Sequence, residues 1–180
     1  MKFYILIPVY RAEAFLEASL ASVFAQTWQN FEVVLVDDGS PDGSGALCDR
    51  LAAEDARVHA LHQENTGPYG ARRTAIRYCL DHGAPTDWAV FLDADDSLKP
   101  NALETIAKAH RETGGDLIFI GEDQVQGGKV LRPFPRDMAF IGTVTDKARL
   151  YKIVFQDGWY NPLWKKAAPL GLLPREDREE

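Results

Sequence analysis

The sequence predicts an α/β protein in which a mostly parallel sheet is flanked by helices. Three observations support this fold class. Short apolar runs of strand length alternate with longer stretches in which apolar residues recur at helical spacing. The runs are apolar throughout, which is typical of strands that helices cover on both faces. The chain has 180 residues, of which 46% are hydrophobic, enough for the core of one domain spanning residues 1–180.

The first part of the chain predicts two strands and two helices. Phe3–Val9 is a continuous apolar run and is expected to form a buried strand. A helical stripe of apolar residues over 14–26 predicts the first helix. Val33–Val36 is rich in β-branched residues and predicts the second strand. Ser40 followed by Pro41 is typical of a helix start, so we expect the second helix to begin there.

The middle of the chain continues this alternation, and the pattern weakens towards the C-terminus. The spacing of apolar residues and the turn residues between them predict seven further elements. In chain order these are a strand at 58–61, a helix at 70–80, a strand at 88–92, a helix from Pro100 to Gly114, a strand at 117–120, a hairpin at 125–134 and a helix at 146–155.

Composition narrows the classes of protein that fit. The formal net charge of −7 argues against sequence-independent binding of nucleic acid. Cys48 and Cys79 are the only cysteines, which argues against a disulfide framework, fits the cytoplasm and predicts buried thiols. No signal peptide is visible, and no apolar run approaches the roughly 20 residues that span a bilayer. Contact with the inner face of a membrane would require regions missing from this sequence, or a partner.

Acidic side chains gather where two predicted strands end. Asp93, Asp95 and Asp96 follow the strand at 88–92, and carboxylates this close repel one another unless a cation lies between them. A divalent metal that carries a phosphate-containing substrate is the natural candidate. The pair Asp37–Asp38 follows the second strand, and it either takes part in ligand binding or only forms a turn. Because ligands bind at the carboxyl ends of strands in such sheets, we expect both groups at one rim.

Four segments, in this order, resemble the family-2 inverting glycosyltransferases, which have the GT-A fold. They are Ile7-Pro8-Val9-Tyr10, Gln26-Thr27, Val34-Leu35-Val36-Asp37-Asp38-Gly39-Ser40-Pro41-Asp42 and Leu92-Asp93-Ala94-Asp95-Asp96. The resemblance is firm over residues 3–120 and loose beyond. It implies a Rossmann-like domain with a nucleotide-sugar-binding half at 1–120. Residues 121–180 would begin an acceptor-side half, truncated if the natural chain continues.

The resemblance also implies an activity and its partners. A sugar would move from a nucleoside-diphosphate sugar, with UDP favoured over GDP and dTDP, to a hydroxyl of a glycan or lipid-linked acceptor in polysaccharide synthesis. Asp95, together with Asp93, would bind Mn or Mg. The residues implied in donor binding are Pro8, Tyr10, Glu13, Asp37, Asp38, Asn65, Gly67, Gly70, Arg72, Asp93 and Ala94. Arg11 stands where the family commonly has Asn.

The catalytic base is implied near the end of the chain. The segment 161–166 resembles the strand that precedes the family's Glu-Asp pair, and Glu176 and Asp177 then match that pair. In inverting enzymes one such carboxylate takes the proton of the acceptor hydroxyl. The alternative for these two residues is a solvated charged tail.

Two other functions are compatible with parts of the pattern. One is a nucleotide-sugar-binding module without catalytic activity. The other is a phospho-receiver signalling domain, which also has an acidic pair after an apolar strand. A receiver would carry that pair after its first strand and a Lys after a later one, and Ile120-Gly121 offers none. The loop 65–70 is either a phosphate cradle or a mobile segment, and the four histidines are expected to be structural or on the surface.

Overall fold

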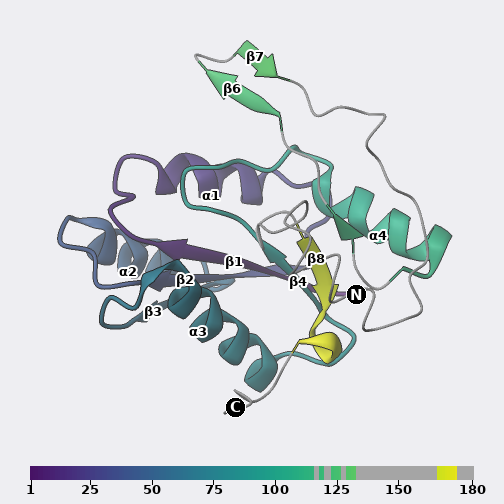
Figure 1. Ribbon diagram of the computed structural model, residues 1–180, viewed down its shortest axis with the longest axis horizontal. Helices are drawn as coiled ribbons and strands as arrows, with labels where there is room; N and C mark the ends of the chain where they lie inside the picture. The colour runs from purple at the N-terminus through teal and green to yellow at the C-terminus, as the bar shows by residue number, and fades with distance from the viewer. Residues whose placement is uncertain (116–117, 120–122, 127–128, 133–165, 174–180) are drawn as a thin grey trace.

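The strand β1 (Phe3–Val9) lies inside a six-stranded sheet with the order β3-β2-β1-β4-β8-β5 (Figure 1). The structure is a computed structural model that describes residues 1–115, 118–119, 123–126, 129–132 and 166–173. The other strands of this sheet are β2 (Phe31–Asp37), β3 (Val58–His62), β4 (Trp88–Phe91), β5 (Ile118–Phe119) and β8 (Lys166–Pro169). The predicted α/β architecture is confirmed.

The neighbours of β1 set the direction of the sheet. β1 pairs in parallel with β2 on one side and with β4 on the other, and β2 pairs in parallel with β3. β8 is antiparallel to both β4 and β5, so the sheet is mostly parallel, as predicted. The chain builds outwards from β1 to β3 and then returns to place β4 on the other side of β1. This reversal is a topological switch point, where sheets of this kind bind ligands.

Helices cover both faces of the sheet because alternate residues of each strand point in opposite directions. Ile5 and Ile7 of β1 face the core packed by α1 (Leu16–Phe24), α2 (Ser44–Glu54) and α4 (Ala102–Thr113). Tyr4 and Leu6 face the opposite core, which α3 (Gly67–His82) covers. Both cores are closed to water at β1, which explains why the run is apolar at every position.

The start predicted for the second helix is wrong, because α2 begins at Ser44 rather than at Ser40. Ser40 is used to close a turn instead. Its backbone N–H donates to Asp37 Oδ1 at 3.1 Å, and its hydroxyl accepts the N–H of Arg11 at 3.2 Å. The side chain therefore ties the loop after β2 to the loop after β1, and it is not free to cap a helix.

Most other boundaries agree with prediction to within a few residues. α3 begins at Gly67, with Pro68 in its first turn, rather than at Gly70. α4 ends at Thr113, and Gly114 caps it with a left-handed φ of +64°, the conformation that a closing glycine provides. A hairpin of β6 (Gln124–Gln126) and β7 (Lys129–Arg132) is present. The helix expected at 146–155 lies outside the described residues.

The cysteines and histidines are placed as expected. Cys48 and Cys79 are buried in the two different cores, and burial raises the pKa of each thiol to about 12. The histidines lie on the surface or against neighbouring side chains, for example His82, whose ring stacks on Tyr78. Within the described residues, no helix is both long and apolar enough to cross a membrane.

Ser44 offers a test of how the loops at the rim are held. Its fully buried hydroxyl accepts the N–H of Ala12 at 2.9 Å and so joins the start of α2 to the loop after β1. Ser44→Ala leaves that N–H without an acceptor, and we expect a loss of about 1–3 kcal/mol in the free energy of unfolding. Ser97→Ala, at an exposed position between β4 and α4, is the matched control. Urea unfolding curves that coincide for the two variants would contradict this role.

Candidate functional site

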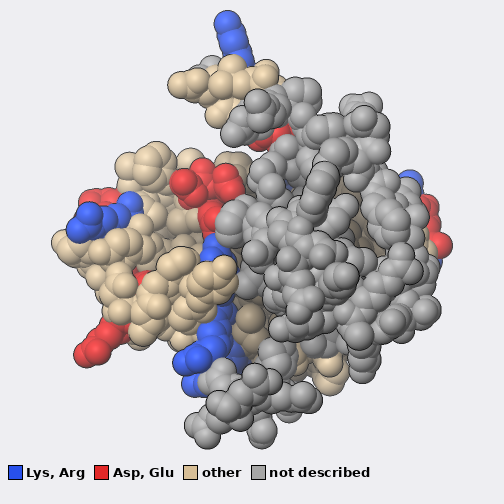
Figure 2. All heavy atoms as spheres, viewed as in Figure 1, with Lys and Arg blue, Asp and Glu red and all other residues tan. Residues whose placement is uncertain are grey.

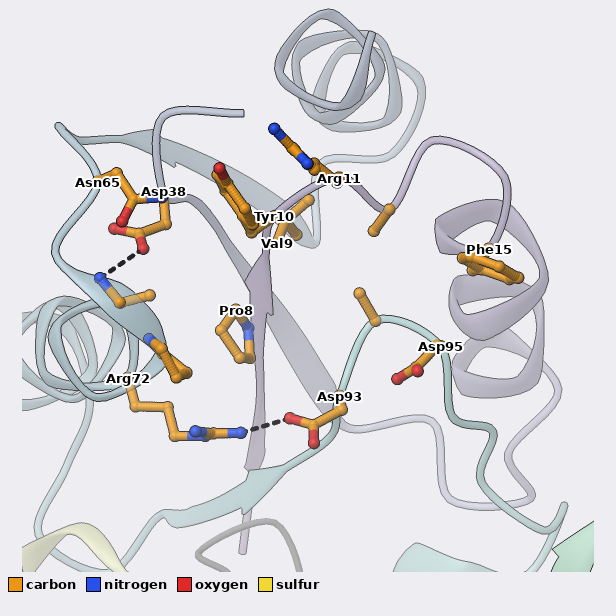
Figure 3. A pocket seen from close by; sticks show the side chains of 15 residues that line it. Pro8, Val9, Tyr10, Arg11, Phe15, Asp38, Asn65, Arg72, Asp93 and Asp95 are labelled. Atoms are coloured by element: carbon orange, nitrogen blue, oxygen red, sulfur yellow. Dashed lines mark hydrogen bonds and ion pairs between the residues drawn. The ribbon is translucent and has the colours of Figure 1, made fainter. Parts of the chain in front are cut away.

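An open cavity of about 400 Å³ lies at the carboxyl ends of β1, β2 and β4 (Figure 3). It is at the switch point between β1 and β4. Most of the residues expected to bind the donor or a metal line it, namely Pro8, Tyr10, Asp38, Asn65, Gly67, Arg72, Asp93, Ala94 and Asp95. Asp38 and Asn65 lie at one side of the cavity, and Phe15 and Asp95 lie at the other.

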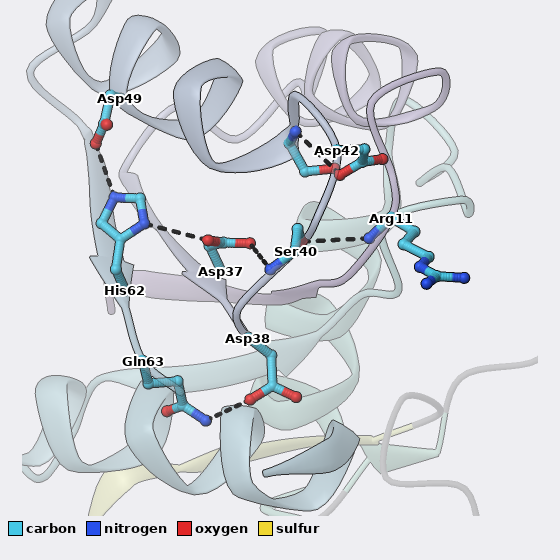
Figure 4. A network of polar contacts seen from close by, with 9 residues as sticks. Arg11, Asp37, Asp38, Ser40, Asp42, Asp49, His62 and Gln63 are labelled. Carbon is cyan, nitrogen blue, oxygen red and sulfur yellow. Dashed lines mark hydrogen bonds and ion pairs between the residues drawn. The ribbon is translucent and has the colours of Figure 1, made fainter. Parts of the chain in front are cut away.

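Asp38 holds the start of α3 against the end of β2. The residue is only 3% exposed, and its two carboxylate oxygens accept the backbone N–H groups of Thr66 at 2.9 Å and Gly67 at 2.8 Å. The amide of Gln63 donates to the same carboxylate at 2.6 Å (Figure 4). These donors compensate the buried negative charge and fix the segment that borders the cavity.

Gln63 and Thr74 support this segment, and neither was predicted from the sequence as a site residue. The side-chain carbonyl oxygen of Gln63 accepts the hydroxyl of Thr74 at 2.5 Å, while its amide also reaches the hydroxyl of Thr66. Gln63 therefore joins Asp38 to the body of α3. The loop 65–70 is ordered by these contacts, and most of it belongs to the helix rather than forming a separate loop. A lone Gln at the end of a weak strand carries no signal that predicts such a role.

Arg72 and Asp93 form an ion pair inside the cavity. The guanidinium Nη2 lies 2.5 Å from Asp93 Oδ1, and Arg72 is only 5% exposed although it is charged. The neighbouring Arg73 is exposed and does not line the cavity, so α3 turns one of its two adjacent arginines towards the site. On the face shown in Figure 2, acidic side chains lie next to a strip of basic ones over α3.

Among the carboxylates that line the cavity, Asp95 is the one without a partner in the described part of the chain. It is exposed, it lines the cavity, and no hydrogen bond or ion pair joins it to another described residue. The described residues contain no group of three His, Cys, Asp or Glu side chains that could hold a metal by themselves. Mn or Mg bound through one or two carboxylates, with substrate phosphates and water completing the shell, does not need such a group. The donor set therefore fits a metal that arrives with a phosphorylated ligand.

Tyr10 and Arg11 are exposed residues that line the cavity. Arg11 adopts a left-handed φ of +52°, a region in which Asn is tolerated far better than Arg. Asn, which the resemblance implies at this position, would adopt that conformation with less strain. The guanidinium of Arg11 lies 5.4 Å from the centre of the Tyr10 ring, a cation–π distance. Arg11 was not predicted as a site residue, although its departure from the family pattern marked the position.

Some predicted residues do not reach the cavity. Asp37 accepts the N–H of Ser40 and faces His62 at 3.3 Å, on the side of β2 that faces α2. Glu13 accepts the N–H of Gly43 at 3.0 Å and holds the turn before α2. Gly70 lies on α3 outside the lining. The expected base residues Glu176 and Asp177 lie beyond the described residues.

The fold and the cavity define an α/β domain with an open cavity at the carboxyl edge of a mostly parallel sheet. The sequence model of Glycosyl transferase family 2 matches residues 4–169, and the chain belongs to this family. Glycosyltransferase GlyG of Streptococcus pneumoniae serotype 4 is 35% identical over 116 residues, which are 64% of this chain and 37% of GlyG. Family membership argues against the phospho-receiver alternative.

Solved structures share the same fold. TarS of S. aureus (residues 1–349), in complex with UDP-GlcNAc, has a TM-score of 0.69 at 23% sequence identity. The match covers 94% of this chain and 46% of that chain. The mannosyltransferase PcManGT of Pyrobaculum calidifontis, in complex with GDP-Man and Mn²⁺, has a TM-score of 0.50 at 23% identity, covering 68% of this chain and 36% of that chain. The likeness confirms the predicted GT-A fold. This chain spans less than half the length of each of these proteins.

Replacing Asp38 tests whether its carboxylate orders the rim. Asp38→Asn puts an amide NH₂ where a carboxylate oxygen accepts backbone N–H groups, so two donors face each other. We expect a loss of about 1.5–3 kcal/mol in unfolding free energy and faster hydrogen exchange at Thr66 and Gly67. Asp81→Asn, at an exposed position of α3, is the control. Equal stability and equal exchange in both variants would show that Asp38 is not the tether.

The His62 network predicts a pH dependence of stability. The ring lies 2.8 Å from Asp49 and 3.3 Å from Asp37, and the hydrogen bond with Asp49, followed by the one with Asp37, raises the pKa of His62 above 6.5 (Figure 4). A raised pKa stabilises the fold below 6.5, and this contribution disappears as the pH rises through the folded-state value. The thermal midpoint of the unsubstituted chain should therefore fall as the pH rises through that value. In His62→Gln this fall should be absent, and in Asp49→Asn most of it should be lost. A fall that persists in both variants would contradict the assignment.

Proposed function

We propose that this chain binds a nucleoside-diphosphate sugar in the cavity and transfers the sugar, with inversion, to a hydroxyl acceptor in glycan synthesis. UDP is the favoured nucleotide, and Mn or Mg is the cofactor. One observation carries the proposal: Asp95, without a described partner, and the buried Arg72 face the same cavity at the switch point. A hard cation prefers the first group, and a diphosphate prefers the second.

The placement of the ligand follows from the two sides of the cavity. We assign the nucleoside to the side of Asp38 and Asn65, with Tyr10 against the base. The diphosphate then lies between Arg72 and Asp95. TarS in complex with UDP-GlcNAc and PcManGT in complex with GDP-Man and Mn²⁺ support a nucleotide sugar and a divalent metal. A bound metal would neutralise charge on the departing nucleoside diphosphate.

Arg72 and Asp93 prepare the site for this ligand. The charges of Arg72 and Asp93 neutralise each other in this structure, which lowers the free-energy cost of burying the guanidinium. A diphosphate offers Arg72 a bidentate anionic partner. Once the guanidinium of Arg72 also binds the phosphates, Asp93 can accept a hydrogen bond from a ribose hydroxyl or bind the metal together with Asp95.

The remaining parts of the reaction are assigned beyond the described residues. We propose residues 1–120 as the donor-binding half and 121–180 as the start of an acceptor-side half within one domain. Glu176 or Asp177 would take the proton from a glycan or lipid-linked acceptor. Membrane contact, where the acceptor requires it, would come from regions outside this chain or from a partner.

Metal-dependent binding of UDP tests the proposal. UDP with manganese should raise the thermal midpoint more than UDP alone, because the metal lowers the Kd for UDP and tighter binding stabilises the folded state further. A ligand at about 100 times its Kd stabilises the folded state by about 2.7 kcal/mol. Asp95→Asn should remove the manganese-dependent part, and Asp81→Asn should keep it. If the Asp95 variant responds like the Asp81 control, Asp95 does not hold the metal. Binding without sugar transfer by a longer chain would favour an inactive binding module.

A further inference from the structure

Phe15 is an exposed aromatic residue at the far side of the cavity. It immediately precedes α1, which buries Leu16, Leu20 and Val23 in the core. The Phe15 side chain does not join them: it is 53% exposed and lines the cavity. Figure 3 shows its ring near Asp95, across the cavity from Asp38 and Asn65. Core packing therefore does not account for a large apolar side chain at this position.

The surroundings of Phe15 leave room for a ligand. Its backbone N–H donates to the carbonyl of Ala12 at 2.9 Å, so the loop after β1 places the residue firmly. Ala12 and Ala94 line the same cavity with the smallest side chains that carry a Cβ atom. The Phe15 ring, the two alanines and the exposed Asp95 carboxylate together form a subsite that is partly apolar and partly polar. Ligand sites commonly combine an apolar surface with a few polar groups in this way.

We propose that Phe15 is a specificity-determining residue on which the apolar face of the transferred sugar packs. This inference rests on the proposed function. With the nucleoside at Asp38 and the diphosphate between Arg72 and Asp95, the sugar lies beyond the diphosphate, on the side of Phe15. The C–H face of a sugar ring that covers the Phe15 ring removes apolar area from water. Asp95 lines the same side of the cavity (Figure 3) and offers the sugar's hydroxyl groups a polar neighbour.

A comparison of nucleotide with nucleotide sugar isolates this contact. The whole chain, with manganese, is titrated calorimetrically with UDP and GDP, and then with UDP-glucose, UDP-galactose, UDP-GlcNAc and GDP-mannose. We expect at least one sugar to bind roughly threefold to tenfold more tightly than its parent nucleotide, a gain of the size that one aromatic contact provides. Phe15→Ala should abolish that gain and leave the affinity for the nucleotide unchanged. Phe15→Tyr should retain it.

Tyr69→Ala is the matched control, because Tyr69 is an exposed aromatic residue of α3 that does not line the cavity. It should keep the gain, and all three variants should keep the thermal midpoint of the unsubstituted chain. The inference is overturned if no sugar improves binding, if Phe15→Ala keeps the gain, or if that variant weakens nucleotide and nucleotide sugar equally. Failure of both nucleotides to bind with manganese would overturn the proposed function, and this inference with it.

Discussion

The parallel pairing of β2, β1 and β4 is the constraint on which the site depends. Val9 lies opposite Asp37, and Leu6 lies opposite Phe91, so all three strands deliver their carboxyl ends to one edge. A shift of one residue would move every side chain of a strand to the opposite face, into a core that different helices pack. The hydrophobic cores thus fix the register, and the register brings together polar groups that are far apart in the sequence.

The charges at this edge are balanced through α3. Asp38 accepts the first backbone N–H groups of the helix, and further along the same helix Arg72 reaches Asp93. One helix therefore compensates an acidic residue after β2 and another after β4. Among the carboxylates that line the cavity, Asp95 is left without a described partner, so it is the exposed negative charge there that can recruit a cation. Burial holds the other groups in place, while exposure keeps this one accessible.

The strands and the acidic rim could be predicted because they depend on local patterns. Continuous apolar runs end at Asp37 and Asp93, and the structure places both ends at the same edge. The start of α2 could not be predicted, because the Ser40 hydroxyl accepts a hydrogen bond from Arg11, a residue distant in sequence. Gln63 escaped for the same reason, since its role exists only once α3 has packed beside β2. The antiparallel strand β8 had no strand pattern of its own: the resemblance implied a strand at 161–166, and β8 begins only at Lys166, the last residue of that segment.

The central claim is that a cation at Asp95 and the guanidinium of Arg72 together hold a nucleoside diphosphate at the switch point. A crystal structure with manganese and UDP tests it most directly, since manganese scatters anomalously. We predict an anomalous peak about 2 Å from an Asp95 oxygen and from diphosphate oxygens, with the uracil on the side of Asp38 and Arg72 on the phosphates. UDP bound at this edge with no metal at Asp95, or bound elsewhere on the chain, would contradict it.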